Sequence, residues 1–265
     1  MSESRTPTLV FLHGFLGSSH EWDVVAKQLA QDYPVLCPDL PGHGLPAANL
    51  PDQVDFDSIN QWLITYLKQH EVTHYILIGY SLGGRIALHH AVQTAELDDH
   101  DSGELVGLIL EGANPGLCDA KSRQERLASD IDWSRKLARK PITHVVKEWY
   151  QQPMFADLDD AQRKQLIRER GKAWGNSLAT VITGLSLGKQ QDFREWLTKT
   201  QLPIHYIHGE KDSKFADICS EIKQLNSKIV EHSIYGAGHN THRADPVHFV
   251  QTLNNAIQSI ENDND

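Results

Sequence analysis

The chain has 265 residues and a formal net charge of −10, from 25 Lys and Arg against 35 Asp and Glu. Its length suits one large core with an insertion better than two independent cores. It has no run of basic residues and no basic aromatic stripe, which argues against a nucleic-acid partner. The apolar stretches are far shorter than the roughly 20 residues of a membrane-spanning helix. We therefore expect no stable membrane insertion, and the sequence favours no particular oligomeric state.

The three cysteines, Cys37, Cys118 and Cys219, are widely spaced, and none belongs to a paired Cys or His motif. This pattern argues against a disulfide framework and against a zinc site, so we expect reduced thiols and no metal. The first seven residues are polar and lack the apolar centre of a secretory signal. We therefore predict a cytoplasmic protein.

Short apolar runs rich in Val, Ile and Tyr alternate along the chain with stretches of helical periodicity. The strand-like runs are Thr8–Leu12, Tyr33–Pro38, His74–Ile78, Leu105–Leu110, Ile204–Ile207 and Lys228–Ile234. The helix-like stretches are Glu21–Gln31, Phe56–Gln69 and Leu82–Gln93. Continuous apolar runs are typical of parallel strands that are buried on both faces. The alternation predicts an α/β fold with a doubly wound, mostly parallel central sheet flanked by helices.

The alternation stops after Leu110 and resumes at Pro203. Residues 114–200 have a helical pattern, are rich in charge and contain the tryptophans Trp133, Trp149, Trp174 and Trp196. We predict a helical lid inserted over the carboxyl edge of the sheet, where open α/β sheets bind ligands. A solvated helical subdomain is the alternative. The predicted division is core 1–113, lid 114–200 and core 201–265.

The stretch Gly79-Tyr80-Ser81-Leu82-Gly83 lies between a strand and a helix and matches the G-x-S-x-G turn of nucleophilic serines. A turn this sharp leaves no space for side chains at its flanking positions, which explains the glycines. Ser81 then lies at a helix N-terminus, where free N–H groups favour developing negative charge. We predict that Ser81 is the reactive residue. A glycine-rich turn with an N-cap serine is the alternative.

A serine hydroxyl must pass its proton to an imidazole that a carboxylate orients. In this class of motif the partners follow in the order Ser, Asp or Glu, His. Asp212 comes just after the strand-like run Ile204–Ile207, on a tight turn at the sheet edge, and we predict that it is the carboxylate. Glu210 and Asp217 are the competitors.

The base is expected after the last strand-like run and before the final helix. His239 lies there, in the small-residue loop Tyr235–Asn240. Chain order and loop position therefore predict that His239 is the base. Other histidines of this half are expected to be structural: His205, His232 and His242.

An oxyanion site needs two backbone donors near the serine. One is expected from Leu82, which follows Ser81, and the other from Phe15 in the glycine-rich loop after the first strand. The side chains of His13 and His43 are expected to be structural.

Arg85 lies four residues after Ser81, hence on the same helix face, with its side chain leaning back towards the serine. It could hold a substrate carboxylate, because a guanidinium binds a carboxylate through two charge-assisted hydrogen bonds. Arginines of the helical block could equally be solvated surface charges: Arg123, Arg126, Arg168 and Arg170.

Longer stretches carry a more specific signal: LVFLHGFLGSSHEW, CPDLPGHG, IGYSLGGRIALHHA, LEGANPGL, EWYQQPMF, GEKDSKF and GAGHNTHR. Together they resemble the 2-succinyl-6-hydroxy-2,4-cyclohexadiene-1-carboxylate synthase family of menaquinone (vitamin K2) biosynthesis, along nearly the whole chain. That family is part of the α/β-hydrolase superfamily. The HGF, PGHG and G-x-S-x-G stretches specify only the fold, whereas SLGGR, NPGL, WYQQP and DSKF discriminate the family.

The resemblance implies a carbon–oxygen lyase without a metal or organic cofactor. Such an enzyme eliminates pyruvate from 5-enolpyruvoyl-6-hydroxy-2-succinyl-cyclohex-3-ene-1-carboxylate by removing a ring proton. Ser81 would act as the general base through His239 and Asp212. The small substrate is polyanionic, and the resemblance assigns its binding, besides Arg85, to Arg126, Arg170, Tyr80 and Trp149.

Two other functions are compatible with these residues. The same serine, histidine and aspartate could hydrolyse esters or carbon–carbon bonds by nucleophilic attack. A non-catalytic binding module could also keep the fold, although the intact set of three groups argues against it.

Overall fold

The computed structural model describes residues 6–44, 49–97 and 103–264. Residues 1–5, most of the polar start discussed above, lie outside the described residues. The described residues form a six-stranded sheet of order β2-β1-β3-β4-β5-β6, in which all adjacent strands are parallel. Its strands are β1 (Thr8–Leu12), β2 (Val35–Leu36), β3 (His74–Tyr80), β4 (Glu104–Glu111), β5 (Ile204–Gly209) and β6 (Val230–Ile234).

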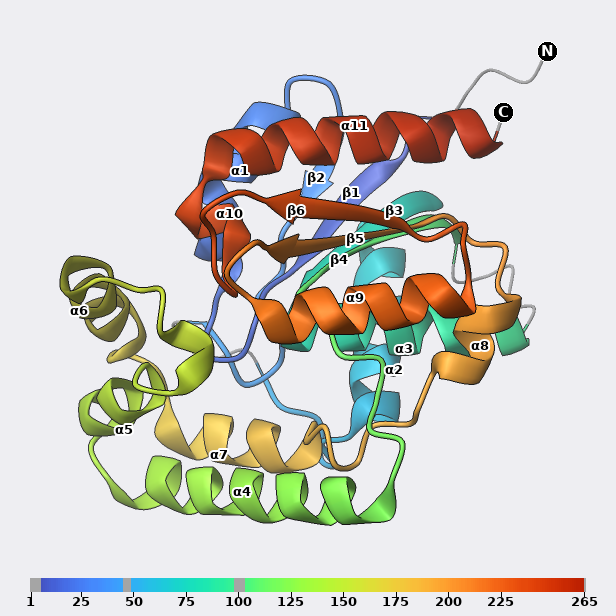
Figure 1. Cartoon of the computed structure of the whole chain (residues 1–265). Coiled ribbons are helices and arrows are strands. Elements are labelled where there is room, and N and C mark those ends of the chain that lie inside the picture. The colour runs from blue at the N-terminus through green and yellow to red at the C-terminus, as the bar shows by residue number, and fades with distance from the viewer. Residues whose placement is uncertain (1–5, 45–48, 98–102, 265) are drawn as a thin grey trace.

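Helices cover both faces of this sheet (Figure 1). One face carries α1 (Asp23–Leu29) and α11 (Pro246–Asn264). The other carries α2 (Phe56–Gln69), α3 (Leu82–Leu97) and α9 (Ser213–Leu225). The short helical turns η1 (Ser19–Trp22) and α10 (Thr241–Ala244) precede α1 and α11. The predicted α/β architecture is therefore confirmed.

The first strand shows why its sequence is apolar without a break. Leu9 and Phe11 pack into the cluster shared with α1 and α11, whereas Val10 and Leu12 pack into the cluster under α2, α3 and α9. All four side chains are fully buried. Side chains of a strand alternate between the two faces, and here both faces are covered, so neither set can be polar.

The segment between β4 and β5 folds into helices, and all but the last gather beyond one end of the sheet, whereas the last lies beside α9 (Figure 1). These are α4 (Ala120–Arg139), α5 (Ile142–Trp149), η3 (Pro153–Phe155), α6 (Asp160–Arg170), α7 (Gly175–Gly184) and α8 (Arg194–Lys199). All of these except α8 share an apolar cluster of their own, which also includes Leu16 from the loop after β1. Leu197 of α8 packs into the cluster under α2, α3 and α9 instead. The helices lie within the predicted range 114–200. The division into core and lid stays a prediction.

The second strand is much shorter than predicted, whereas β6 lacks only the first two predicted residues. The run Tyr33–Pro38 contributes only Val35–Leu36 to the sheet, as β2 at its edge. Pro34 and Pro38 bracket this strand, and proline has no backbone N–H to donate to a ladder. Pro34 still takes part as an acceptor, since its carbonyl receives the N–H of Leu9 at 2.8 Å.

Among the described residues, no helix combines the length and the apolar character needed to cross a membrane.

A buried polar relay links β3 to the helices on one face. His90 on α3 is completely buried, and burial lowers its pKa to about 3, so the ring is neutral at physiological pH. Its Nδ1 donates to Asn60 Oδ1 at 2.6 Å, and its Nε2 accepts the hydroxyl of Tyr75 at 2.6 Å. The Asn60 oxygen can only accept, so the proton must lie on Nδ1.

We predict that Tyr75→Phe lowers the free energy of unfolding by about 1–2 kcal/mol at pH 7, because it leaves the buried Nε2 of His90 without its donor. Denaturant unfolding followed by circular dichroism measures this change. Tyr235→Phe is the matched control, since Tyr235 is 85% exposed. Equal unfolding midpoints for the two variants would contradict the prediction.

Candidate active site

Ser81 lies at the turn from β3 into α3, in a left-handed backbone conformation with φ +50°. Its N–H donates to the carbonyl of Glu111 at 2.8 Å, which ties the turn to the end of β4. A Cβ atom on Gly83 would lie 2.1 Å from the carbonyl oxygen of Leu12, and one on Gly79 would lie 2.6 Å from the backbone of Gly83. The turn can therefore exist only with glycine at these positions.

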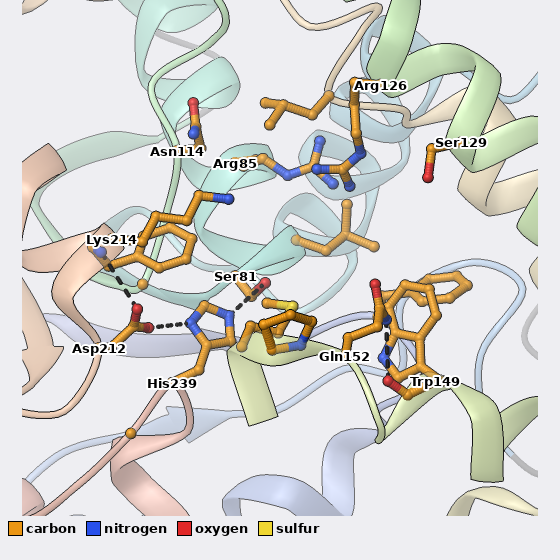
Figure 2. Close-up of a pocket in the computed structure, with 18 of the residues that line it drawn as sticks. Ser81, Arg85, Asn114, Arg126, Ser129, Trp149, Gln152, Asp212, Lys214 and His239 are labelled. Atoms are coloured by element: carbon orange, nitrogen blue, oxygen red, sulfur yellow. Dashed lines mark hydrogen bonds and ion pairs between the residues drawn. The ribbon is translucent and has the colours of Figure 1, made fainter. Parts of the chain in front are cut away.

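His239 and Asp212 converge on Ser81 from two other loops (Figure 2). The Ser81 hydroxyl donates to His239 Nε2 at 3.3 Å, and His239 Nδ1 donates to Asp212 Oδ2 at 2.8 Å. Asp212 also caps α9, since its Oδ1 accepts the N–H of Phe215 at 3.4 Å. Both His239 and Asp212 are buried. The structure thus brings together the three groups that the sequence predicted, in a geometry that suits proton relay.

The competing residues lie elsewhere. Glu210 accepts the N–H of Gly236 at 2.9 Å, and Asp217 is exposed on α9. His205 and His232 stack on each other with ring centroids 5.2 Å apart. His242 donates to Glu111 Oε2 at 2.6 Å.

The loop after β1 places Phe15 beside the serine. Phe15 and Leu82 both line the cavity into which Ser81 points, and their role as oxyanion donors stays a prediction. His13 in the same loop is fully buried, and burial lowers its pKa well below the usual value. Its Nδ1 donates to Gly14 O at 2.8 Å and its Nε2 accepts the N–H of Leu40 at 3.0 Å. His13 therefore fixes the loop.

A cavity of about 700 Å³ opens above the three groups. The loops of the sheet form its floor, and helices α4, α5 and α7 supply much of its wall. Phe15, Trp149 and Trp133 build an aromatic side, with ring centroids 5.1 Å and 4.9 Å apart in that order. Trp149, which the resemblance assigns to substrate binding, thus lies at the cavity.

Arg85 and Arg126 both line the cavity, and their guanidinium groups converge in Figure 2. Arg85 Nη1 donates to Leu185 O at 2.9 Å. Burial, and then the charge of Arg126, lower the pKa of Arg85 to about 9. Arg126 Nε donates to both carboxylate oxygens of Asp130, at 3.0 and 2.9 Å. Because two cations repel each other in a partly desolvated space, an anion between them would be favoured.

Two other expected binding residues lie away from this cavity. Arg170 is buried, and its Nη2 donates to Glu21 Oε1 at 2.5 Å. Although burial opposes it, the charge of Glu21 raises the pKa of Arg170. Tyr80 lines a separate cavity of about 170 Å³ together with Glu21 and Tyr150. Neither residue lines the main cavity, and the buried Glu21 engages the guanidinium of Arg170. The expected contact of Arg170 and Tyr80 with a ligand stays a prediction.

Sequence reasoning missed several polar groups that line the main cavity: Asn114, Ser129, Gln152, Lys211 and Lys214. Lys214 is the most informative of these. Its side chain extends toward Arg85 and Asn114 (Figure 2), and burial together with the charge of Arg126 lowers its pKa. The available signal was its place two residues after Asp212, in the first turn of α9.

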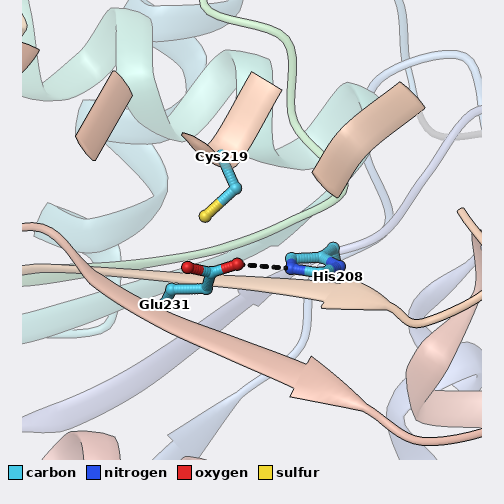
Figure 3. Close-up of side chains that lie close together, drawn as sticks. All are labelled: His208, Cys219 and Glu231. Atoms are coloured by element: carbon cyan, nitrogen blue, oxygen red, sulfur yellow. Dashed lines mark hydrogen bonds and ion pairs between the residues drawn. The ribbon is translucent and has the colours of Figure 1, made fainter. Parts of the chain in front are cut away.

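Among the described residues, the one group whose atoms could together hold a metal is His208, Cys219 and Glu231 (Figure 3). Two of its members already pair with each other. Glu231 accepts from His208 Nε2 at 3.0 Å and from Lys223 Nζ at 2.7 Å. Burial raises the pKa of the Cys219 thiol to about 12. A carboxylate that accepts from an imidazole and an ammonium group, beside a protonated thiol, forms a structural network.

Comparison with known proteins agrees with this geometry. A model described as the alpha/beta hydrolase family matches residues 9–251. An esterase from Thermogutta terrifontis superposes with a TM-score of 0.78 over 96% of this chain and 90% of its own, at 17% identity, which supports the fold alone. The chain belongs to the α/β-hydrolase family.

More similar relatives narrow the family. A protein from Enterobacter sp. (strain 638) is 43% identical over 240 residues, 91% of this chain and 87% of its own length. Another, from Klebsiella pneumoniae (strain 342), is 40% identical over 97% of this chain and 96% of its own. Both are named 2-succinyl-6-hydroxy-2,4-cyclohexadiene-1-carboxylate synthase, and within the α/β hydrolases the chain belongs to that family. The structure of MenH from S. aureus superposes with a TM-score of 0.87 at 26% identity, covering 97% of this chain and 96% of its own.

Proposed function

We propose that this chain eliminates pyruvate from 5-enolpyruvoyl-6-hydroxy-2-succinyl-cyclohex-3-ene-1-carboxylate to give 2-succinyl-6-hydroxy-2,4-cyclohexadiene-1-carboxylate. The observation that carries the proposal is the relay of Ser81, His239 and Asp212 at the floor of a cavity that contains several cations. The relatives that share 40–43% identity carry the name of this synthase. A triad alone fits many reactions, whereas cations above it select an anionic substrate.

The change in bonds defines what the site must do. A ring with one double bond and an oxygen substituent at carbon 5 becomes a 2,4-diene when carbon 2 loses its proton and the bond from carbon 5 to oxygen breaks. Ser81 takes the ring proton while its own hydroxyl proton passes to His239 Nε2, and Asp212 stabilises the imidazolium. Negative charge develops on the succinyl carbonyl oxygen, and hydrogen bonds donated by the backbone N–H groups of Phe15 and Leu82 stabilise it. The oxygen leaves carbon 5 as the enolate of pyruvate, and the proton held by His239 converts this enolate into pyruvate and restores the neutral imidazole, so water is not a reactant.

The three carboxylates of the substrate explain the cations of the cavity. Arg85 and Arg126 both line the cavity, and Lys214 reaches in from the first turn of α9. We assign one carboxylate to each of these three side chains, so that Lys214 takes the place expected for Arg170. Asp130 orients Arg126 through two hydrogen bonds and accepts the hydroxyl of Ser186 at 2.7 Å.

The enzyme is further proposed to be cytoplasmic. Cys37, Cys118 and Cys219 are all free thiols. Unpaired cysteines are typical of reducing compartments.

Incubation of the purified protein with the enolpyruvoyl substrate is expected to release pyruvate, measured by coupling to lactate dehydrogenase. Ser81→Ala should lower kcat by at least about 100-fold, because removing one member disables the relay. Equal pyruvate release by the wild type and the variant would reject the mechanism. A burst with p-nitrophenyl esters and a trapped acyl-Ser81, without pyruvate release, would instead indicate an ester hydrolase.

Arg85→Ala and Arg126→Ala are each expected to lower kcat/KM by at least about tenfold, since a lost charge-assisted contact costs roughly 1.5–3 kcal/mol. Arg123→Ala is the control, because Arg123 lies on α4 and donates to Leu117 O outside the cavity. Steady-state kinetics with the same substrate measure the effect. Unchanged kcat/KM in both cavity variants would show that these guanidinium groups do not contact the substrate.

Lys214→Gln is expected to lower kcat/KM by about five- to tenfold, mainly through KM, because the substrate loses one charge-assisted contact. Lys223→Gln makes the same chemical change on the same helix, where Lys223 pairs with Glu231 outside the cavity. Its kinetics should match those of the wild type. If Lys214→Gln behaves like Lys223→Gln, then Lys214 does not bind a carboxylate.

A further inference from the structure

Glu111, the last residue of β4, is a completely buried carboxylate. In the sheet it pairs with Tyr80 at the end of β3 and with Ile207 on β5, so it lies between the strands that lead to Ser81 and to Asp212. It does not line the main cavity. Burying a carboxylate costs several kcal/mol unless charges and donors compensate it. The donors that Glu111 attracts therefore indicate what the residue holds in place.

Among the residues that the structure describes, the donors to the Glu111 carboxylate come from Thr241 and His242, which begin α10. Oε1 accepts the N–H of Thr241 at 2.6 Å, its hydroxyl at 2.6 Å and the N–H of His242 at 3.1 Å. Oε2 accepts His242 Nδ1 at 2.6 Å. Although burial alone would raise it, the charge and hydrogen bonds of His242 lower the pKa of Glu111, so the group is ionised. The carboxylate thus fixes the backbone two residues beyond His239.

The backbone around Glu111 contacts the other half of the site. Its carbonyl oxygen accepts the N–H of Ser81 at 2.8 Å. The next residue, Gly112, has φ +55°, and a Cβ there would lie 2.8 Å from His239 Cε1. Residues 111 and 112 therefore contact the turn that carries the serine, the ring of the histidine and the loop that follows it.

We propose that Glu111 is a positioning residue that keeps His239 within reach of Ser81, a role that rests on the function proposed above. The hydroxyl of Ser81 lies 3.3 Å from His239 Nε2, already at the outer limit for direct proton transfer. A shift of the loop by a fraction of an ångström would break this contact. The loss should appear in kcat, because the cations that bind the substrate lie on α3, α4 and α9.

Two substitutions separate the position of the loop from the charge of Glu111. Glu111→Gln keeps Oε1 as an acceptor for Thr241 and His242, and its amide can donate to Nδ1 of a neutral His242. Its kcat should stay within about threefold of the wild type. Glu111→Leu removes every acceptor, and its kcat should fall at least about thirtyfold while KM stays within about threefold.

Tyr75→Phe is the control for general destabilisation, because it weakens a buried polar relay on the other face of β3. It should leave kcat unchanged at temperatures where all variants are folded. If Glu111→Leu does not fold, Thr241→Val removes one donor to Oε1 and should lower kcat about threefold. The proposal would be overturned if Glu111→Leu had the kcat of the wild type. If that variant does not fold, a wild-type kcat in Thr241→Val would overturn it. A loss of kcat in Tyr75→Phe as large as that in Glu111→Leu would also overturn it.

Hydrogen exchange tests the same inference without substrate. The amides of Thr241 and His242 should exchange slowly in the wild type and at least about tenfold faster in Glu111→Leu. If Glu111→Leu does not fold, the faster exchange is expected in Thr241→Val. In Tyr75→Phe the two amides should exchange as slowly as in the wild type. Unchanged exchange in the variant used would overturn the proposal. If the wild type releases no pyruvate, the proposed function fails, whereas exchange at these two amides still decides whether Glu111 holds the loop.

Discussion

The left-handed backbone of Ser81 is the constraint on which the rest of the site depends. A non-glycine residue in this region stores strain, which the surroundings must offset. Here the glycines at positions 79 and 83 allow close approach of neighbouring backbone, and the carbonyl of Glu111 accepts the serine N–H. The close approach at the glycines and the hydrogen bond from Ser81 both require that the adjacent parallel strands β1, β3 and β4 end at the same edge of the sheet. The buried apolar faces of the sheet thus supply the rigidity that holds a strained turn in place.

The charges of the molecule are arranged in two different ways. The buried carboxylate of Glu21 pairs with Arg170, and that of Glu111 accepts hydrogen bonds from Thr241 and His242. In the cavity, by contrast, the guanidinium of Arg85 has neutral hydrogen-bond partners, and burial, followed by the charge of Arg126, lowers its pKa. The first arrangement fixes elements of the fold. The second leaves positive charge available for an anionic ligand.

Local sequence patterns predicted the sheet, the serine turn and the order of the three groups because each depends on short stretches. The hydrophobic periodicity and the order of the motifs along the chain are sufficient to predict that Ser81, Asp212 and His239 lie at one edge of the central sheet. The patterns do not reveal contacts between residues that are distant in the chain. Arg170 meets Glu21 across 149 positions, and nothing near either residue indicates that both are buried. Lys214 was missed because a lysine on a helix is usually a solvated charge.

The two parts of the cavity come from different stretches of the chain, and this has an evolutionary consequence. The relay is built on loops of the sheet, whereas Arg126, Trp133 and Trp149 come from one contiguous block between β4 and β5. Mutation or replacement of that block can therefore alter ligand selectivity while the proton-transfer apparatus is inherited intact. Such modularity would let one ancestral scaffold diversify into lineages with unrelated substrates.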